Sequence, residues 1–576
     1  MQRLWCVLPI VLAFGTTAAQ QSSAQVPQSR DLRTELAAIA QLAGEPQLLS
    51  AAGVTRSERP LLTLENPSPF DIDRSQQRRL VIVAGLDGDE RGTAAALAAV
   101  RWFKTSAPRS LHEAWVISAL PSALPAGSPN SAGAPRLVFP PEGGFFDHPE
   151  EPESRYVWRW VTFQAPDLVL EIRGGDSIAW SGSGVPGLTN LPPPSGSLAA
   201  AISSSSTSAT GTAPGVIVTA RAADGPQLLQ HLLKAAAAIG RSPLHAALAA
   251  RASREPLDIA RVLAKRYPQN PIVSYIPSVS WFNMLRLTDA THDPSFAQAV
   301  RQQTQPWTSG ERPLFGDRIV LTAAAGTMIY AELAERGDEP ARALALQGAD
   351  AASAEGADGI AKYGQGWTDD MFMASAILSR TGKMPGRARD LDRVASLLIS
   401  YAKRLQRPDG IFDHFTMGRG AWGRGNGFAA LGLMEALTSL PATHPARADV
   451  LAIYLRQMDG LKRMQAPDGT WRQIIDEPGA YREESATAMT LSAMARGVRL
   501  GWLDQSYRPI IARAWRALSA HVTEDGGIVD ICTSTGAGPT SRYYFDRAAI
   551  SGADDRGGAM ALMASMEMYL LTHNPR

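Results

Sequence analysis

Two adjacent carboxylates stand out in the segment 366–373, which reads GWTDDMFM. The apolar spacing after them predicts a helix that begins at a glycine turn, with Asp369 and Asp370 in its first turn. A carboxyl group held against Trp and Met loses hydration, which raises its pKa and lets it act as a general acid near neutral pH. The alternative is that one aspartate only caps the helix.

A second polar cluster lies in the segment 413–428, where glycines surround His414, Trp422, Arg424 and Asn426. The glycines predict a backbone that bends closely around a ligand. The Arg424 fork suits a carboxylate, and the Trp422 ring suits the face of a sugar. Each residue alone is explained as well by packing or structural hydrogen bonding, but together they indicate a binding site.

A third cluster, WRQIID followed by YREES, spans 471–485 and precedes another predicted helix. Tyr481 and Arg482 stand in the loop before that helix, while Glu484 and Ser485 could cap it. One more carboxylate, Asp317, precedes an earlier helix start. We expect these side chains to lie at the same site as those of the first two clusters.

The elements that position these clusters fall into two classes. The β-branched runs 79–85, 114–120, 167–172 and 216–219 alternate with helices at 92–104 and 227–239, which predicts an α/β domain with a parallel sheet. From about 255 onward, amphipathic helices alternate with turns, and three similar turns recur at 407–410, 466–469 and 524–527. Such a repeat predicts an all-α toroid of helix pairs with the turn loops gathered at one mouth.

The length of 576 residues favours more than one domain. We expect a signal peptide at 1–24, cleaved near Ala19 or Ala24, which indicates a secreted or periplasmic protein. An N-terminal helix and linker at 25–59, an α/β domain at 60–252 and the all-α domain at 253–576 follow. Of the two cysteines only Cys532 follows the expected cleavage site, so no disulfide is expected.

The charge balance limits the partners. The 56 basic and 55 acidic residues nearly cancel and form no long run, which argues against a nucleic-acid partner. After the first 24 residues no apolar stretch is long enough to insert into a membrane. The sequence leaves the oligomeric state open.

The three ordered motifs WTDDMFM, HF…WGRGNGF and WRQIID…YREES resemble the unsaturated glucuronyl and rhamnogalacturonyl hydrolases of glycoside hydrolase families 88 and 105. The resemblance covers roughly 260–570 and implies an (α/α)6 barrel. It also implies hydration of the C4=C5 double bond in the terminal uronic acid of an oligosaccharide left by a polysaccharide lyase, with no metal or organic cofactor.

By motif match, Asp369 is implied as the general acid/base and Asp317 as its catalytic partner, with Asp370 as a rival to Asp369. The implied substrate-binding residues are Trp367, Asp370, His414, Trp422, Arg424, Asn426, Tyr481 and Arg482, with Arg424 on the uronate carboxylate. Which polysaccharide supplies the substrate is left open.

The strand and loop VIVAGLDGDERG resemble the zinc-binding turn of zinc carboxypeptidases, over about 60–250. Asp87 stands where that family has a His, Glu90 matches its Glu, and Arg173 stands where a third ligand is expected. Because Arg brings a positive charge towards the cation, a degenerate, inactive domain is predicted. The alternatives are a non-catalytic carbohydrate-binding protein, or a metallo-carboxypeptidase or amidase acting through this domain.

Overall fold

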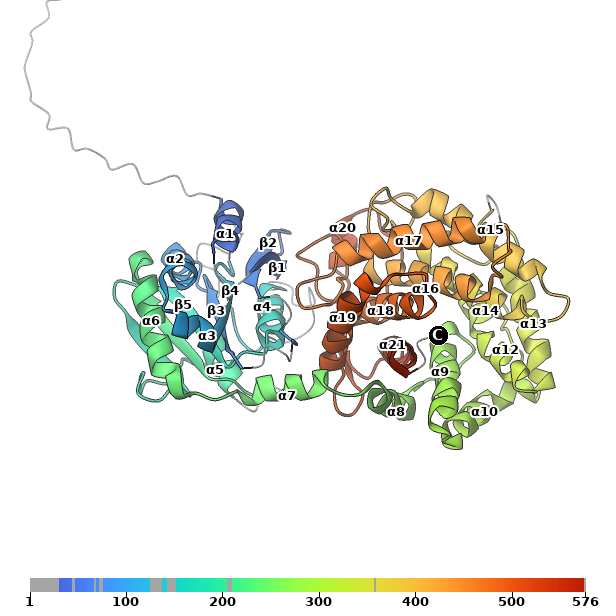
Figure 1. The fold of residues 1–576 in the computed structure, drawn as a ribbon, viewed down its shortest axis with the longest axis horizontal. Coiled ribbons are helices and arrows are strands. Elements are labelled where there is room, and N and C mark those ends of the chain that lie inside the picture. The colour runs from blue at the N-terminus through green and yellow to red at the C-terminus, as the bar shows by residue number, and fades with distance from the viewer. Residues whose placement is uncertain are drawn as a thin grey trace, which may run out of the picture.

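The computed structural model describes residues 31–43, 47–66, 69–71, 76–124, 137–141, 152–204, 210–356 and 359–573. An α/β domain and a mostly helical domain lie side by side and are joined through α7 (Pro243–Ala252) (Figure 1). The predicted signal peptide lies outside the described residues. Within the described ranges, no helix is both long and apolar enough to cross a membrane.

The first domain is built on a seven-stranded mixed sheet. Its spatial order is β1 (Leu48–Val54), β2 (Pro60–Glu65), β4 (Trp115–Leu120), β3 (Arg78–Ala84), β5 (Leu168–Gly174), β7 (Gly215–Ala220) and β6 (Ala179–Ser183). The four central strands are parallel, as predicted, and antiparallel strands close both edges. After β3 the chain continues to β4 on one side of the sheet, whereas after β5 it continues to β6 and β7 on the other side. The neighbouring strands β3 and β5 therefore have connections that run in opposite directions.

Alternating side chains of the central strands fill two cores. Leu80, Ile82 and Leu170 pack on the face covered by α1 (Leu32–Ala40), α2 (Glu90–Ser106) and α6 (Gly225–Ala235). Val81 and Val169 point to the opposite face, where α4 (Pro152–Phe163) and α5 (Leu198–Ser203) pack. The short helix α3 (Arg109–Ala114) leads into β4.

One prediction about this domain is wrong. The helix expected in the segment 25–59 is present as α1, but the linker expected after it contains β1, which pairs with β2 at the sheet edge. A short strand rich in small residues carries little hydrophobic alternation, so its pairing is decided by the neighbouring strand rather than by its own sequence. The edge strand β6, which reads AWSGS, was missed for the same reason, and β2 was also not predicted.

The second domain is a closed double ring of helices, which confirms the toroid prediction. The inner ring passes through helices that each contact the next: α9 (Tyr275–Thr291), α11 (Leu321–Gly326) with α12 (Met328–Glu335), α14 (Thr368–Thr381), α16 (Gly423–Ser439), α18 (Glu484–Arg499) and α21 (Asp555–His573). The outer helices alternate with them along the chain: α8 (Pro256–Arg266), α10 (Pro294–Thr308), α13 (Glu339–Ser353), α15 (Arg389–Leu405), α17 (Arg447–Arg463) and α19 (Arg508–His521). This is an (α/α)6 barrel.

The three recurring turns follow α15, α17 and α19, where the chain returns from the outer to the inner ring. Gly410, Gly469 and Gly526 have positive φ in these turns, a conformation that other residues adopt at a cost. The return loops before α21 also carry α20 (Ser541–Phe545) and a two-stranded sheet of β8 (Ile528–Cys532) and β9 (Ala549–Gly552).

Polar and aromatic contacts fix the two domains to each other. The Arg482 guanidinium donates from Nη1 to the Ala51 carbonyl of β1 at 2.8 Å and lies 3.4 Å from the Glu65 carboxylate of β2. The Phe163 ring of α4 stacks on the His521 ring of α19 with centroids 3.9 Å apart. The loop before α18 is therefore part of the domain interface.

Candidate active site

Asp369 stands at the wall of a cavity at one mouth of the barrel. It lies in the first turn of α14, as predicted, and its side chain is 24% exposed. The cavity has a volume of about 330 Å³ and is also lined by Trp367, Tyr363 and Met373. Asp369 Oδ2 lies 3.0 Å from His414 Nε2, whereas Oδ1 has no hydrogen-bond partner within the described ranges. One carboxylate oxygen is thus held while the other is left for a ligand.

Asp370 is buried and its carboxylate is occupied. Its Oδ2 accepts hydrogen bonds from the Gln365 and Gly366 amides at 2.9 and 2.7 Å and from the Tyr401 hydroxyl at 2.7 Å. Burial raises the pKa of Asp370 to about 6, which the Tyr401 hydrogen bond partly opposes. These contacts tie the loop before α14 to the helix, so Asp370 has a supporting role in the structure.

His414 connects Asp369 to the interior. The imidazole is buried, and its Nδ1 lies 2.9 Å from the Tyr544 hydroxyl. Burial raises the pKa of Tyr544 to about 12, so its hydroxyl keeps its proton and can donate to Nδ1. That arrangement leaves the His414 Nε2 proton directed at Asp369 Oδ2, where it stabilises the carboxylate form. His414 therefore holds Asp369, and the prediction that it contacts the sugar is replaced by this role.

The loop that carries His414 is clamped by Asn426. Asn426 Oδ1 accepts a hydrogen bond from the Phe412 N–H at 2.8 Å, and Asn426 Nδ2 donates one to the Phe412 carbonyl at 2.9 Å. Asn426 is fully buried, so the expectation that it binds substrate is wrong.

The glycines of the WGRGNGF motif do not form the loop bent closely around a ligand that was expected. They lie in the first turn of α16, where a Cβ on Gly423 would stand 2.2 Å from the Arg472 carbonyl. A Cβ on Gly425 would stand 2.6 Å from Thr368 Oγ1. The glycines therefore bring α16 close to α14 and to the third motif.

Arg424 does not reach the cavity. The side chain is 4% exposed, donates from Nε to Ser485 Oγ at 2.8 Å, and binds the Glu483 carboxylate and the Cys532 carbonyl. Burial lowers the pKa of Arg424, but the Glu483 carboxylate raises it by more, so the pKa of Arg424 is raised overall. The expectation that Arg424 binds the uronate carboxylate is wrong, because Glu483 caps α18 and requires this cation as its partner.

Four other predicted residues also fall outside the cavity wall. Trp422 is buried against His414 and donates to Gln473 Oε1 at 3.3 Å, and Tyr481 is buried. Arg482 is paired with Asp468 at 2.9 Å and with Glu65 across the domain interface. Asp317 is exposed and is not among the lining residues, although Arg318 beside it is. Aromatic and basic residues near a site build its supporting walls as often as they face it, and sequence alone does not separate the two.

Two cationic residues that line the cavity were missed. Arg318 and Lys362 stand on the loops before α11 and α14, and both side chains are exposed. Arg318 forms no ion pair with any described residue, so its guanidinium is available to an anion. The only sequence signal for Arg318 was its position next to Asp317.

Comparison with known proteins places this site in a family context. An unsaturated rhamnogalacturonyl hydrolase of Bacillus subtilis is 27% identical over 188 residues, covering 31% of this chain and 53% of the relative. An unsaturated 3S-rhamnoglycuronyl hydrolase of Alteromonas is 27% identical over 175 residues, covering 28% and 42%. The chain thus spans about half the length of the curated relatives it matches.

A solved structure supports the fold of the second domain. A glycoside hydrolase of family 105 from C. acetobutylicum ATCC 824 aligns with a TM-score of 0.51 at 20% identity, covering 55% of this chain and 99% of that structure. The family model of Glycosyl Hydrolase Family 88 matches residues 257–572, which include the whole barrel from α9 and the Asp369 cavity, and the chain belongs to this family.

Proposed function

We propose that this chain is a hydrolase that removes the terminal 4,5-unsaturated uronic acid from oligosaccharides produced by polysaccharide lyases. The observation that carries the proposal is Asp369, a partly exposed carboxylate with one free oxygen in a barrel-mouth cavity and a buried His414 behind it. Family membership and the two named relatives, which act on unsaturated uronyl substrates by their names, support the same substrate class.

The proposed reaction needs one proton donor and one water. Asp369 gives its proton to C4 of the C4=C5 double bond, and water adds its oxygen to C5 while its proton returns to the Asp369 carboxylate. The hemiketal formed at C5 opens to a ketone by breaking the bond between C5 and the ring oxygen. This leaves a hemiacetal at C1, which collapses to an aldehyde and releases the glycosidic partner as an alcohol. His414 holds the charged form of Asp369 between these two proton transfers.

We assign recognition of the uronate carboxylate to Arg318, with Lys362 as a second cation in the same cavity. A guanidinium can bind a carboxylate through two parallel hydrogen bonds, which fixes the orientation of the sugar ring over Asp369. Trp367 and Tyr363 supply the aromatic part of the wall.

The test uses the ultraviolet absorbance of the C4=C5 bond. Purified protein should abolish this absorbance in unsaturated rhamnogalacturonan, ulvan or glycosaminoglycan disaccharides, with one class preferred. Absorbance that persists across the whole panel, together with measurable binding, would support the alternative of a non-catalytic carbohydrate-binding protein.

For the first domain we propose a degenerate carboxypeptidase-like fold without catalysis. The residues at the expected zinc positions do not fit the metal: Arg173 pairs with Glu171 at 2.7 Å from Nε to Oε1, and a guanidinium cannot ligate a cation. We also propose export through the segment 1–24, which N-terminal sequencing of protein recovered outside the cytoplasm would test.

A further inference from the structure

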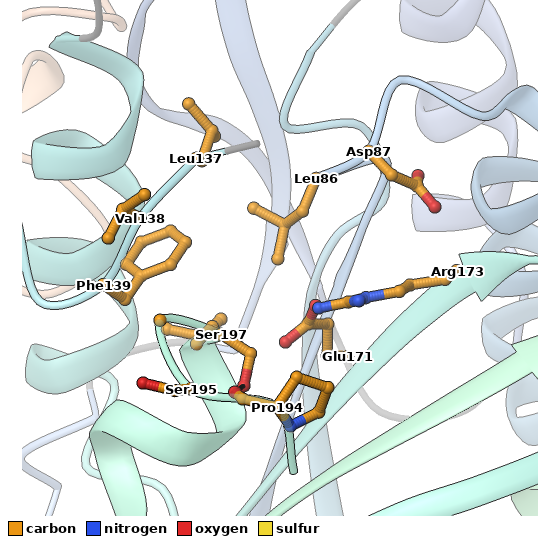
Figure 2. A pocket seen from close by; sticks show the side chains of 12 residues that line it. Leu86, Asp87, Leu137, Val138, Phe139, Glu171, Arg173, Pro194, Ser195 and Ser197 are labelled. Atoms are coloured by element: carbon orange, nitrogen blue, oxygen red, sulfur yellow. Dashed lines mark hydrogen bonds and ion pairs between the residues drawn. The ribbon is translucent and has the colours of Figure 1, made fainter. Parts of the chain in front are cut away.

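A second cavity lies in the α/β domain, at the carboxyl ends of β3 and β5. It is lined by Leu86 and Asp87, which directly follow β3, and by Glu171 and Arg173 of β5 (Figure 2). The connections of these two strands run in opposite directions, and in open sheets ligands bind in the crevice at such a point. The position alone singles out this cavity, independently of any family resemblance.

The floor of the cavity is a buried ion pair. Glu171 and Arg173 are two residues apart on β5, so they point to the same face of the sheet as Val169. Burial raises the pKa of Glu171, which Arg173 opposes. The Glu171 side chain is 1% exposed and the Arg173 side chain is 15% exposed. The strand therefore presents a charged group, rather than an apolar one, at the edge of the crevice.

The geometry of Arg173 shows which group that ligand presents. Its Nε and Nη2 both bind Glu171 Oε1, whereas Nη1 makes no hydrogen bond to the part of the chain that the structure describes. One edge of the guanidinium is thus fixed by Glu171, and the other edge remains open to a carboxylate. Asp87 carries the same sign as such a ligand, but it is exposed to solvent and its carboxylate points away from the apolar wall in Figure 2.

Part of the remaining wall is apolar, and Ser195 and Ser197 also line the cavity. Leu137 and Phe139 face the ion pair across the cavity (Figure 2). Leu86 and Leu198 belong to the same apolar part of the lining. The cavity volume is about 90 Å³. An apolar cavity of about 150 Å³ holds benzene, so the apolar part of this one suits a group smaller than benzene, such as a short aliphatic chain.

We propose that this crevice is a second binding site, separate from the barrel, for a small carboxylate with a short aliphatic body. The carboxylate binds the open edge of Arg173 and the aliphatic body packs on Leu86, Leu137 and Phe139. The site does not depend on the activity proposed for the barrel.

The test uses three probes that share one aliphatic body: 3-methylbutanoate, 3-methylbutanamide and 3-methylbutylamine. Saturation-transfer NMR on the full chain should show the carboxylate bound at least about tenfold more tightly than the amide, as expected for a charge-assisted hydrogen bond. The amine should be weakest. Glucuronate has the same head group on a hydroxylated ring and should not compete.

Variants assign the binding to the crevice. Arg173→Met should lose the preference for the carboxylate, and Asp87→Asn should strengthen carboxylate binding because it removes a like charge. Ser195 lies at an exposed lining position, so Ser195→Trp should block the crevice without altering the core. This variant tests the site even if Arg173→Met does not fold. Arg318→Met, in the barrel, is the matched control and should leave the probe bound.

The proposal is overturned by no binding of 3-methylbutanoate at tens of millimolar concentration, by equal binding of the three probes, or by binding that survives Ser195→Trp. Loss of binding in Arg318→Met would instead place the probe in the barrel and equally overturn it. Because probe binding is measured without turnover, none of these results depends on whether the barrel hydrolyses unsaturated sugars.

Discussion

Replacing Arg318 and Arg424 one at a time separates substrate recognition from structural support. Arg318 lines the Asp369 cavity and has no ion-pair partner among the described residues, whereas Arg424 is buried on Glu483. Arg318→Met should therefore leave stability within about 0.5 kcal/mol of the parent, as for most exposed positions. It should lower kcat/KM by about 10- to 150-fold, which corresponds to about 1.5–3 kcal/mol for a hydrogen bond to a charged group.

Arg424→Met should have the opposite profile. Glu483 is 0% exposed and caps α18 through the Ser485 and Ala486 amides, so removal of Arg424 leaves a buried charge without its cation. Breaking a buried pair in this way costs about 3–5 kcal/mol of folding free energy. The double variant Arg424→Met with Glu483→Gln should recover much of that loss, because the unpaired charge is gone.

Both profiles come from two assays, the loss of C4=C5 absorbance for kcat and KM and urea unfolding for stability. Lys362→Met serves as a second variant of the cavity wall and should raise KM less than Arg318→Met. The reasoning is refuted if Arg318→Met binds and turns over substrate like the parent. It is equally refuted if Arg424→Met is fully stable but has a greatly raised KM.

Three further predictions concern the supporting residues. His414→Gln should lower kcat by about 10- to 100-fold with little change in KM, because it loosens Asp369; an unchanged kcat in steady-state assays would contradict this role. The pKa of Asp370 is raised to about 6. Its protonated carboxyl group therefore makes its full contribution to folding stability below about pH 4, and this contribution is lost as the pH rises through 6. Asp370→Asn should remove this decline in the free energy of unfolding, which is on the order of 3 kcal/mol. If the free energies of unfolding of the parent and of Asp370→Asn change in parallel from pH 4 to 7, the prediction is contradicted. Arg482→Met should destabilise the domain interface by about 3–5 kcal/mol, measured by thermal unfolding, while KM stays the same. A raised KM with normal stability would indicate instead that Arg482 binds the substrate.

The sequence predicted the elements that have strong periodicity. The four parallel strands appear within a few residues of their expected bounds, and helices alternate with turns after residue 255 as expected, because a buried strand or an amphipathic helix repeats its pattern over its whole length. The edge strand β1 could not be predicted, since its pairing depends on β2 and on the Arg472 and Arg482 contacts from the other domain.

The candidate site was predicted in part. The sequence placed Asp369 in a first helical turn and linked it to the segment of His414, and the structure brings these two side chains together. It could not tell which polar residues face the cavity. Arg424 and Asn426 have the residue types of a binding site, but helix packing turns both inward, whereas Arg318 has no distinctive neighbours and lies at the wall.

The most direct test of the central claim is the rate at which Asp369→Asn removes the C4=C5 absorbance, measured beside Asp370→Asn with both proteins confirmed as folded. If Asp369 donates the proton, Asp369→Asn should be slower by about 10²- to 10⁴-fold, the range of general acid–base catalysis. Asp370→Asn should keep most of its activity at neutral pH. Near-parent activity in Asp369→Asn, or a larger loss in Asp370→Asn than in Asp369→Asn, would contradict the account.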